Sequence, residues 1–153
     1  MWSSEVTNMI ITGIWETLYM TLVSTLVGYV IGLPMGIILT VSDKDGIKPN
    51  AVLYKILDVI ANIVRSVPFI ILLVLLIPFT RLVVGKSYGS TATIVPLVIA
   101  AAPYIARMVE SSLKEVDAGV IEAARSMGAS NFTIITKVML VEARTSLLVG
   151  ATI

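Results

Sequence analysis

Very few residues of this chain combine the types and the spacing that chemistry requires. Its 153 residues include no cysteine and no histidine, which excludes disulfides, Cys/His zinc sites, cysteine nucleophiles and histidine acid–base catalysis. A Gly85-Lys86-Ser87 string resembles the end of a phosphate-binding loop, but Thr80 stands where that loop requires its first glycine. We also find no nucleophile–base pair in the sequence. We therefore expect a protein that is not itself an enzyme, with no catalytic, metal or cofactor site.

The polar stretch 114–144 has the most regular pattern in the chain. In its first half, apolar residues recur at spacings of three and four, which gives one apolar face on a short helix. These residues are Val116, Val120, Ala123, Ala124 and Met127. Asp117 is expected to cap the start of this helix, because its side chain can accept backbone hydrogen bonds there. Gly128 follows the last apolar position, where a helix that ends in the left-handed conformation favours glycine.

A second short helix is expected after Ser130, whose hydroxyl can cap it. Its apolar residues are Ile134, Ile135, Val138 and Val141. Two short helices that meet at Gly128 would form a compact knob. On physical grounds this knob could lie on a lipid surface or fit into a socket of a partner protein.

The composition places these short helices in a membrane protein. Hydrophobic residues make up 57% of the chain and charged residues 14%, with a mean hydropathy of +0.97, whereas soluble domains carry about 25% charged residues. The net charge of +1 gives no bulk attraction to nucleic acid, so no nucleic-acid partner is expected. The composition therefore predicts an all-α integral membrane protein surrounded by lipid.

Three apolar stretches are long enough to cross a bilayer core about 30 Å thick, which needs about 20 residues of helix. They are residues 18–41, 59–80 and 87–106. A fourth apolar run begins near Ser146 and stops at Ile153, so we expect three full spans and the start of a fourth, in a fragment of a longer subunit. Residues 1–17 contain acidic but no basic residues, which indicates an outer segment rather than a cleaved signal peptide.

The basic residues indicate how the spans are oriented. Of the 11 Lys and Arg residues, only Arg81 and Lys86 lie in the connection between the second and third spans. The other nine, which include Arg65 within the second span, lie toward the opposite ends of the spans or in the segment after the third span. Because cytoplasmic loops carry the excess of Lys and Arg, we expect the N-terminus outside and the loop 114–144 in the cytoplasm.

The first span has a small residue at every fourth position. These residues are Ser24, Gly28, Gly32 and Gly36. On a helix they form one smooth stripe that lets another backbone approach closely. The sequence therefore predicts a packing seam within a larger helical assembly.

Charged residues are rare within the spans. Arg65 is the only charge between residues 59 and 80, and it is expected about one and a half turns from the cytoplasmic end. Arg107 and Glu110 lie at the inner end of the third span. We expect all three side chains to extend toward the inner headgroups rather than to bind a substrate.

The loop residues resemble the EAA loop of ABC importer permeases. The shared residues are Glu122, Ala123, Ala124, Gly128 and Leu140. The chain differs from the family pattern at Val138 and Val141, where the family has Ile and Pro. Longer strings, namely 65–73, 77–81, 94–97, 101–110 and 121–129, resemble the methionine-type branch, and the resemblance runs from about residue 13 to residue 153.

This resemblance implies a fold, a membrane and partners. The fold is the transmembrane domain of type I ABC importers over residues 13–153, incomplete at its C-terminus, in the bacterial cytoplasmic membrane. Such a permease pairs with a second copy of itself and receives its ligand from a substrate-binding lipoprotein. The loop 114–144 docks on a separate ATPase subunit, which binds the ATP.

The function implied by the resemblance is ATP-driven import of an amino acid, with methionine favoured. In this scheme Glu122 pairs with a basic residue of the ATPase, and Gly128 lets the chain turn tightly. Two alternatives stay open: a permease for another polar amino acid, or a helical membrane assembly protein with no role in transport. The sequence does not identify the residues that contact the substrate.

Overall fold

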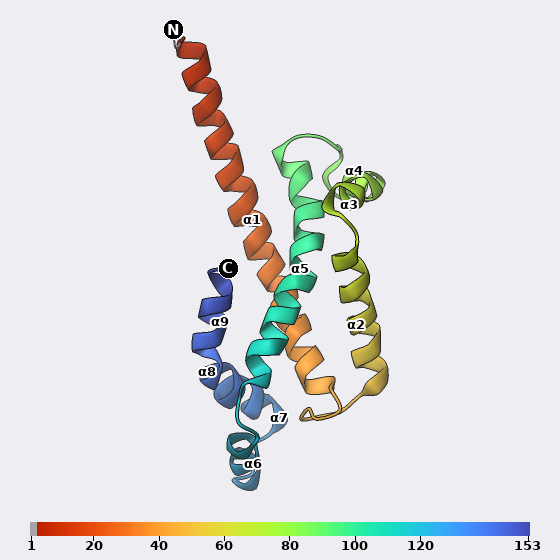
Figure 1. Ribbon diagram of the computed structural model, residues 1–153, viewed down its shortest axis with the longest axis vertical. Coiled ribbons are helices and arrows are strands. Elements are labelled where there is room, and N and C mark those ends of the chain that lie inside the picture. Colours follow the sequence, from red (N-terminus) through yellow and green to blue (C-terminus); the bar gives the residue numbers. More distant parts are fainter. Residues whose placement is uncertain (1–2) are drawn as a thin grey trace.

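The computed structural model describes residues 3–153, which form helices joined by short loops (Figure 1). The helices are α1 (Ser4–Ser42), α2 (Ala51–Ser66), α3 (Phe69–Leu75), α4 (Ile77–Val84), α5 (Ser90–Lys114), α6 (Ala118–Ser126), α7 (Asn131–Thr133), the π-helix η1 (Ile134–Met139), α8 (Leu140–Glu142) and α9 (Arg144–Ala151). Helix α5 is central, and it contacts α1, α2, α3, α4 and α9. The predicted all-α membrane fold is confirmed for the described residues.

Two of these helices are long and apolar enough to cross a membrane, α1 with 39 residues and α5 with 25. They take the places of the first and third expected spans. The second expected span, 59–80, is not one helix, because α2 and α3 meet at 107°. Pro68 lacks a backbone N–H and restricts the residue before it, and Val67 is accordingly extended, with φ −80° and ψ 125°. This span is thus a bent pair of helices.

The stripe of small residues in α1 faces α5. All four residues, Ser24, Gly28, Gly32 and Gly36, are buried. A Cβ atom added at Gly32 would lie 2.8 Å from the Cβ of Ile105, and one added at Gly36 would lie 2.6 Å from the Cβ of Val109. Non-bonded carbon atoms prefer about 3.5–4.0 Å, so the two helices approach this closely only because the side chains are missing.

Helix α1 extends well beyond the helices that pack against it (Figure 1). Side chains 3–19 are exposed, and burial on α1 begins at Ser24. Of the expected outer segment 1–17, residues 1 and 2 lie outside the described part of the chain. The rest is helical from Ser4, with Ser3 as the N-cap.

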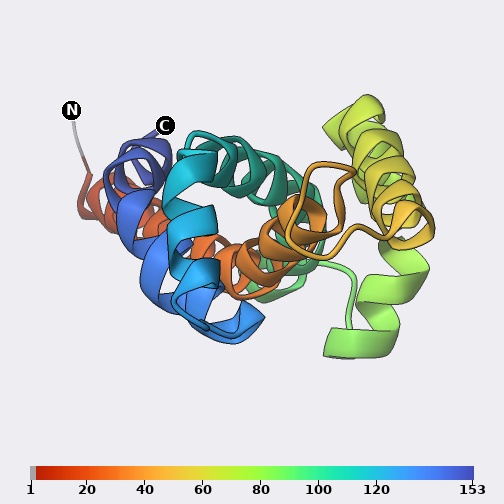
Figure 2. The ribbon, with the colours of Figure 1, turned by 90° about the horizontal axis from the view of Figure 1, so that it is seen from below.

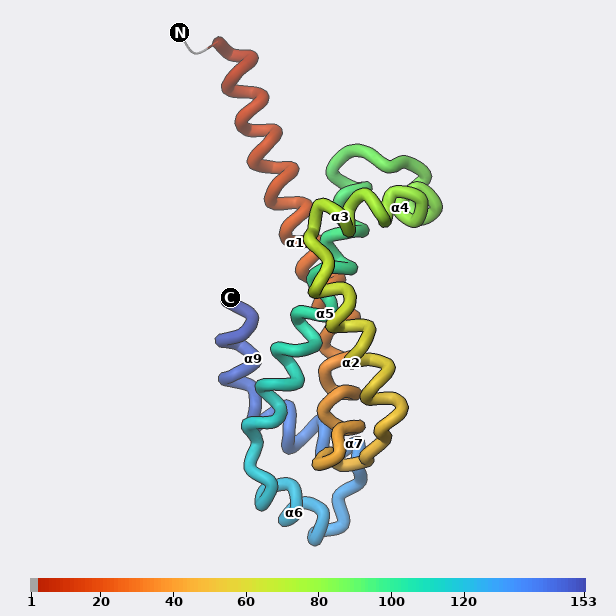
Figure 3. The backbone as a smooth tube through the Cα atoms, turned by 45° about the vertical axis from the view of Figure 1, so that its right-hand side comes forward, coloured from red at the N-terminus to blue at the C-terminus, as the bar shows by residue number. Residues whose placement is uncertain are grey.

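The C-terminal third of the chain forms the base of the molecule. Seen from below, α6 and the helical stretch after it lie beside the ends of α1 and α5 (Figure 2). The chain then turns back, and α9 runs alongside α5 (Figure 3). The hydroxyl of Ser146 on α9 donates a hydrogen bond to that of Ser112 on α5, at 3.0 Å.

Candidate functional site

The loop 114–144 begins with a well-capped short helix. The Asp117 side chain accepts a hydrogen bond from the backbone N–H of Gly119 at 2.6 Å, which satisfies a free donor at the start of α6. The helix ends at Ser126, and Gly128 just after its C-cap has a φ of +82°, in the left-handed region. The N–H of Ala129 then bonds the carbonyl of Ala124 at 3.1 Å, as in a Schellman-type helix end. The capping predictions for Asp117 and Gly128 are confirmed.

The predicted apolar face of α6 is divided between two environments. Ala124 is buried at 5% exposure, and Ile121 packs against the same cluster. Val120, Ala123 and Met127 are instead exposed, Met127 by 82%. Of the predicted apolar residues, Val116 and Ala124 thus pack inside the protein, and the other three are exposed. An apolar stripe of Val120, Ala123 and Met127 remains on the surface.

The second half of the loop is helical, and Ser130 caps it as predicted, its hydroxyl accepting from the N–H of Thr133 at 3.3 Å. Its central part is the π-helix η1, in which each hydrogen bond spans five residues rather than four. Ile134 and Met139, five residues apart, are therefore both buried. Of the other predicted apolar residues of this helix, Ile135 and Val138 are half-buried and pack against the core, whereas Val141 is 48% exposed.

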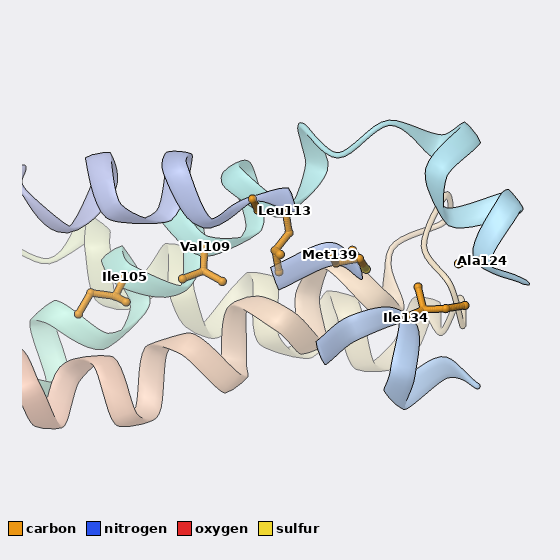
Figure 4. Close-up of a cluster of buried hydrophobic side chains, with 7 residues drawn as sticks. Ile105, Val109, Leu113, Ala124, Ile134 and Met139 are labelled. Carbon is orange, nitrogen blue, oxygen red and sulfur yellow. The ribbon is translucent and has the colours of Figure 1, made fainter. Parts of the chain in front are cut away.

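A hydrophobic cluster joins this loop to α5. Figure 4 shows its side chains running from α5 into the base, and its buried members are Ile105, Val109, Leu113, Ala124, Ile134, Met139 and Ala143. Leu140 packs against the same cluster. On the other side of α6, Arg125 donates a hydrogen bond to the backbone carbonyl of Ile47, at 3.2 Å, in the connection between α1 and α2. The loop is thus fixed both to α5 and to the connection between α1 and α2.

Beside this cluster lies a polar network centred on Glu110 of α5, which is 4% exposed. Its Oε2 accepts from Arg107 at 2.7 Å. Its Oε1 accepts from Lys114 at 2.8 Å and from the Tyr54 hydroxyl at 3.1 Å. Arg107 and Glu110 therefore pair inside the protein instead of extending to headgroups, and that expectation is corrected.

The same network extends to α1 and α2. Arg107 pairs with Asp58 and also donates to Asn62 at 3.3 Å. Lys114 pairs with Asp43, the C-cap of α1, at 2.6 Å. The hydrogen bond from Lys114 lowers the pKa of the Asp43 carboxyl below its usual value. Two of the four ion pairs, Arg107–Asp58 and Lys114–Asp43, thus join α5 to α2 and to the end of α1.

A groove of about 540 Å³ opens between the loop and this network. Asp43, Lys114, Glu122 and Arg125 are among its lining residues. Within residues 3–153, no cluster of three or more acidic side chains could hold a metal ion. The groove is therefore a charged junction between the loop and the helix ends.

The structure separates the predicted residues into two groups. Ser24, Gly28, Gly32 and Gly36 lie along the α1–α5 contact, whereas the loop residues lie at the base. Arg65 lies in the last turn of α2, because this helix begins at Ala51, before the expected span. The network around Glu110 was not predicted. The spacing of Arg107, Glu110 and Lys114 on one helix face was its only signal in the sequence.

Comparison with known proteins assigns this arrangement to a family. Residues 32–153 match the family described as the binding-protein-dependent transport system inner membrane component. The chain belongs to this family. The matched region includes the C-terminal part of α1 from residue 32, the bent pair, α5 and the whole loop.

Two relatives illustrate how much of a family member this chain represents. It is 54% identical over 145 residues to the D-methionine transport system permease protein MetI of Salmonella typhimurium, a match that takes in 95% of this chain and 67% of that protein. It is 46% identical over 157 residues to the methionine import system permease protein MetP of Bacillus subtilis, with 100% of this chain and 71% of that protein covered. The chain thus spans about two thirds of these relatives.

Solved structures support the same assignment. An inward-facing structure of the MetNI methionine ABC transporter contains a chain that is 52% identical, with a TM-score of 0.95 over 99% of this chain and 70% of its own length. An amino acid ABC transporter structure is 24% identical with a TM-score of 0.73, which supports the fold alone. The bent pair and the loop at the base therefore belong to a known permease fold.

Proposed function

We propose that this chain forms part of the permease subunit of an ATP-driven importer of methionine. The observation that carries this proposal is the 52% identity to a chain of a methionine ABC transporter, with a TM-score of 0.95 over nearly the whole chain. The subunit itself provides the pathway and performs no chemistry. ATP is bound and hydrolysed by a separate ATPase subunit, a substrate-binding lipoprotein delivers the ligand, and a second permease copy completes the pathway.

In this proposal the loop 114–144 docks on the ATPase. Its exposed apolar stripe, Val120, Ala123 and Met127, is suited to a cleft in a partner protein. Glu122 is exposed next to this stripe and is available to a basic residue of the partner. Because the buried cluster ties the loop to α5, a displacement of the loop moves the membrane helices with it.

The proposed orientation places the N-terminus outside and the loop 114–144 in the cytoplasm. Ser87 and Ser126 are both exposed, at opposite ends of the molecule. In intact cells, a membrane-impermeant thiol reagent should label a cysteine at Ser87 and should leave one at Ser126 unlabelled. The reverse pattern would contradict the orientation.

Uptake of labelled methionine by the full-length subunit, assembled with its ATPase in vesicles, tests the function directly. Gly128→Val should abolish uptake, because a β-branched residue is strained at φ +82°. Gly128→Asn is the matched control and should keep most activity, because Asn tolerates this conformation. A Cβ at this position meets no atom within 4 Å, so the comparison isolates backbone strain from steric clash.

Glu122→Ala should weaken co-purification of the ATPase, but less severely, since an exposed charge contact contributes about 1 kcal/mol or less. Normal uptake and normal ATPase binding in both Gly128→Val and Glu122→Ala would show that the loop does not couple the subunits. If the transporter takes up another amino acid in preference to methionine, the proposed permease function stands and the proposed substrate is wrong.

A further inference from the structure

The bend between α2 and α3 follows directly after an arginine, Arg65, that lies within an apolar stretch of the chain. Arg65 lies in the last turn of α2, two residues before the extended Val67 and three before Pro68. Its side chain is exposed, and within residues 3–153 it takes part in none of the ion pairs. It is the only charged residue between Asp58 and Arg81.

The depth of Arg65 follows from the lengths of the helices around it. It lies about 21 Å along α2 from Ala51, and about 10 Å beyond Asp58, at 1.5 Å per residue. Asp58 is level with its ion-pair partner Arg107 on α5, and α5 continues for about another 25 Å to Ser90. Arg65 thus lies near the middle of the apolar part of α5, and the end of α2 is level with this part in Figure 1.

Arg65 has few polar neighbours along the chain. Asn62, which accepts a hydrogen bond from Arg107, lies one turn before it on α2, and the next charged residue after it is Arg81. Charged residues within membrane spans almost always face a bundle interior or a water-filled cavity and mark substrate pathways. The guanidinium is therefore suited to a polar cavity rather than to lipid.

The helical register points Arg65 toward the bundle. Tyr54, Asp58 and Ala61 are the residues of α2 that face α5 through hydrogen bonds, ion pairs or complete burial. Arg65 follows Ala61 by four residues, so at 100° per residue it lies about 40° from the same line. Ile63, 59% exposed, lies about 200° away from Arg65 on the opposite face.

The position of Arg65 at the end of α2 also explains how its positive charge is stabilised without an ion-pair partner. The last turn of a helix carries partial negative charge, which favours a cation there. Because Pro68 has no backbone N–H, the carbonyl of Val64 also lacks its usual helical donor. The α2 terminus thus stabilises the charge of Arg65 without using a carboxylate as partner.

We propose that Arg65 is a substrate-binding residue of the translocation pathway, which receives the carboxylate of the amino acid at the break between α2 and α3. This inference rests on the proposed function and adds to it the group that recognises the substrate. A planar guanidinium can hold a carboxylate through two parallel hydrogen bonds. The inference applies to the α-carboxylate and not to the side chain of the amino acid.

Cysteine chemistry at residue 65 tests this proposal. These 153 residues contain no cysteine, so Arg65→Cys can be made in a full-length subunit freed of any cysteine elsewhere. In vesicles containing the assembled transporter, methionine uptake by this variant should fall about tenfold or more, since a hydrogen bond to a charged group contributes enough for such a change. ATPase co-purification and basal ATP hydrolysis should be unchanged.

Charge should then restore transport. A methanethiosulfonate that attaches an aminoethyl ammonium group should recover much of the uptake, whereas one that attaches a sulfonate should not. Excess methionine should slow both modifications. Ile63→Cys is the matched control, and it should react with neither reagent and should transport normally because it faces lipid.

The outcomes separate the two proposals. If the wild-type transporter does not take up methionine, the proposed function fails. If the wild type transports but Arg65→Cys transports equally well, or its thiol is unreactive, or the sulfonate restores uptake as well as the ammonium, the carboxylate-binding role is overturned. Loss of assembly in both Arg65→Cys and Arg65→Lys would assign Arg65 a structural role and would equally overturn it.

Discussion

Helix α5 is held by two kinds of contact. On one side, α1 approaches through glycines that bring its backbone against Ile105 and Val109. On the other side, α2 is joined to it by charged and polar groups around Glu110. The contact between α1 and α5 forms because the glycines have no side chains. The contact between α2 and α5 forms only when several charged and polar side chains are present together.

This difference has consequences for the mechanism. A close apolar seam has no directional bonds, and it resists any added volume because protein interiors are close-packed. A buried ionic network is sensitive to the loss of a single group, since each remaining charge is then left without its partner. The seam is therefore suited to keep α1 and α5 together, whereas the network can be broken or re-formed when the loop below it moves.

The largest expected effect comes from removing the centre of the network. Glu110→Ala leaves Arg107 and Lys114 without a shared carboxylate, and breaking a buried pair in this way costs about 3–5 kcal/mol. We expect a marked loss of thermal stability of the detergent-solubilised full-length subunit. Glu115→Ala, at an exposed position outside the network, should change stability by no more than about 0.5 kcal/mol. Equal melting of the two variants would show that the network does not stabilise the protein.

The seam should give the next largest effect. Gly32→Leu places atoms where a Cβ alone would lie 2.8 Å from Ile105, and overpacking of this kind costs about 1–3 kcal/mol or more. Val30→Leu, at a position 66% exposed, places the same leucine side chain outside the seam and should change stability little. The measurement is the fraction of folded subunit that survives heating in detergent. If the two variants survive equally, the stripe is not a packing seam.

These two contacts also show what the sequence could reveal. The small residues of α1 recur every four positions within one helix, so their common face follows from helical geometry alone. The caps at Asp117, Gly128 and Ser130 are equally local, since each acts on backbone groups only a few residues away. Predictions of this kind were confirmed for the caps because no distant part of the chain is needed to make them.

The network could not be predicted in the same way. Tyr54 and Glu110 are 56 residues apart, and Asp58 and Arg107 are 49 apart, so their contact exists only once α2 packs on α5. The π-helix is a second example, since an α-helical spacing cannot anticipate the burial of Met139 in place of Val138. At the bend, Pro68 accounts for a break in the helix, but the 107° angle depends on how α3 packs against α5.

The smallest expected effect comes from the ion pair at the edge of the network. Its contribution to stability should depend on pH, whereas that of the seam should not. Asp43 and Lys114 have side chains 20% and 41% exposed, so their pair contributes about 1 kcal/mol or less. The pKa of Asp43 is lowered in the folded protein, mainly by the hydrogen bond from Lys114. The stabilisation is therefore complete above the ordinary pKa of about 3.9 and is lost as the pH falls through the lowered value. Asp43→Asn should thus melt below the wild type at neutral pH by a constant amount, and this deficit should shrink below about pH 4. The deficit of Gly32→Leu should not shrink in that way, because no titrating group lies in the seam contact. A deficit of Asp43→Asn that stayed constant or widened in acid would show that the pair with Lys114 does not stabilise the folded subunit.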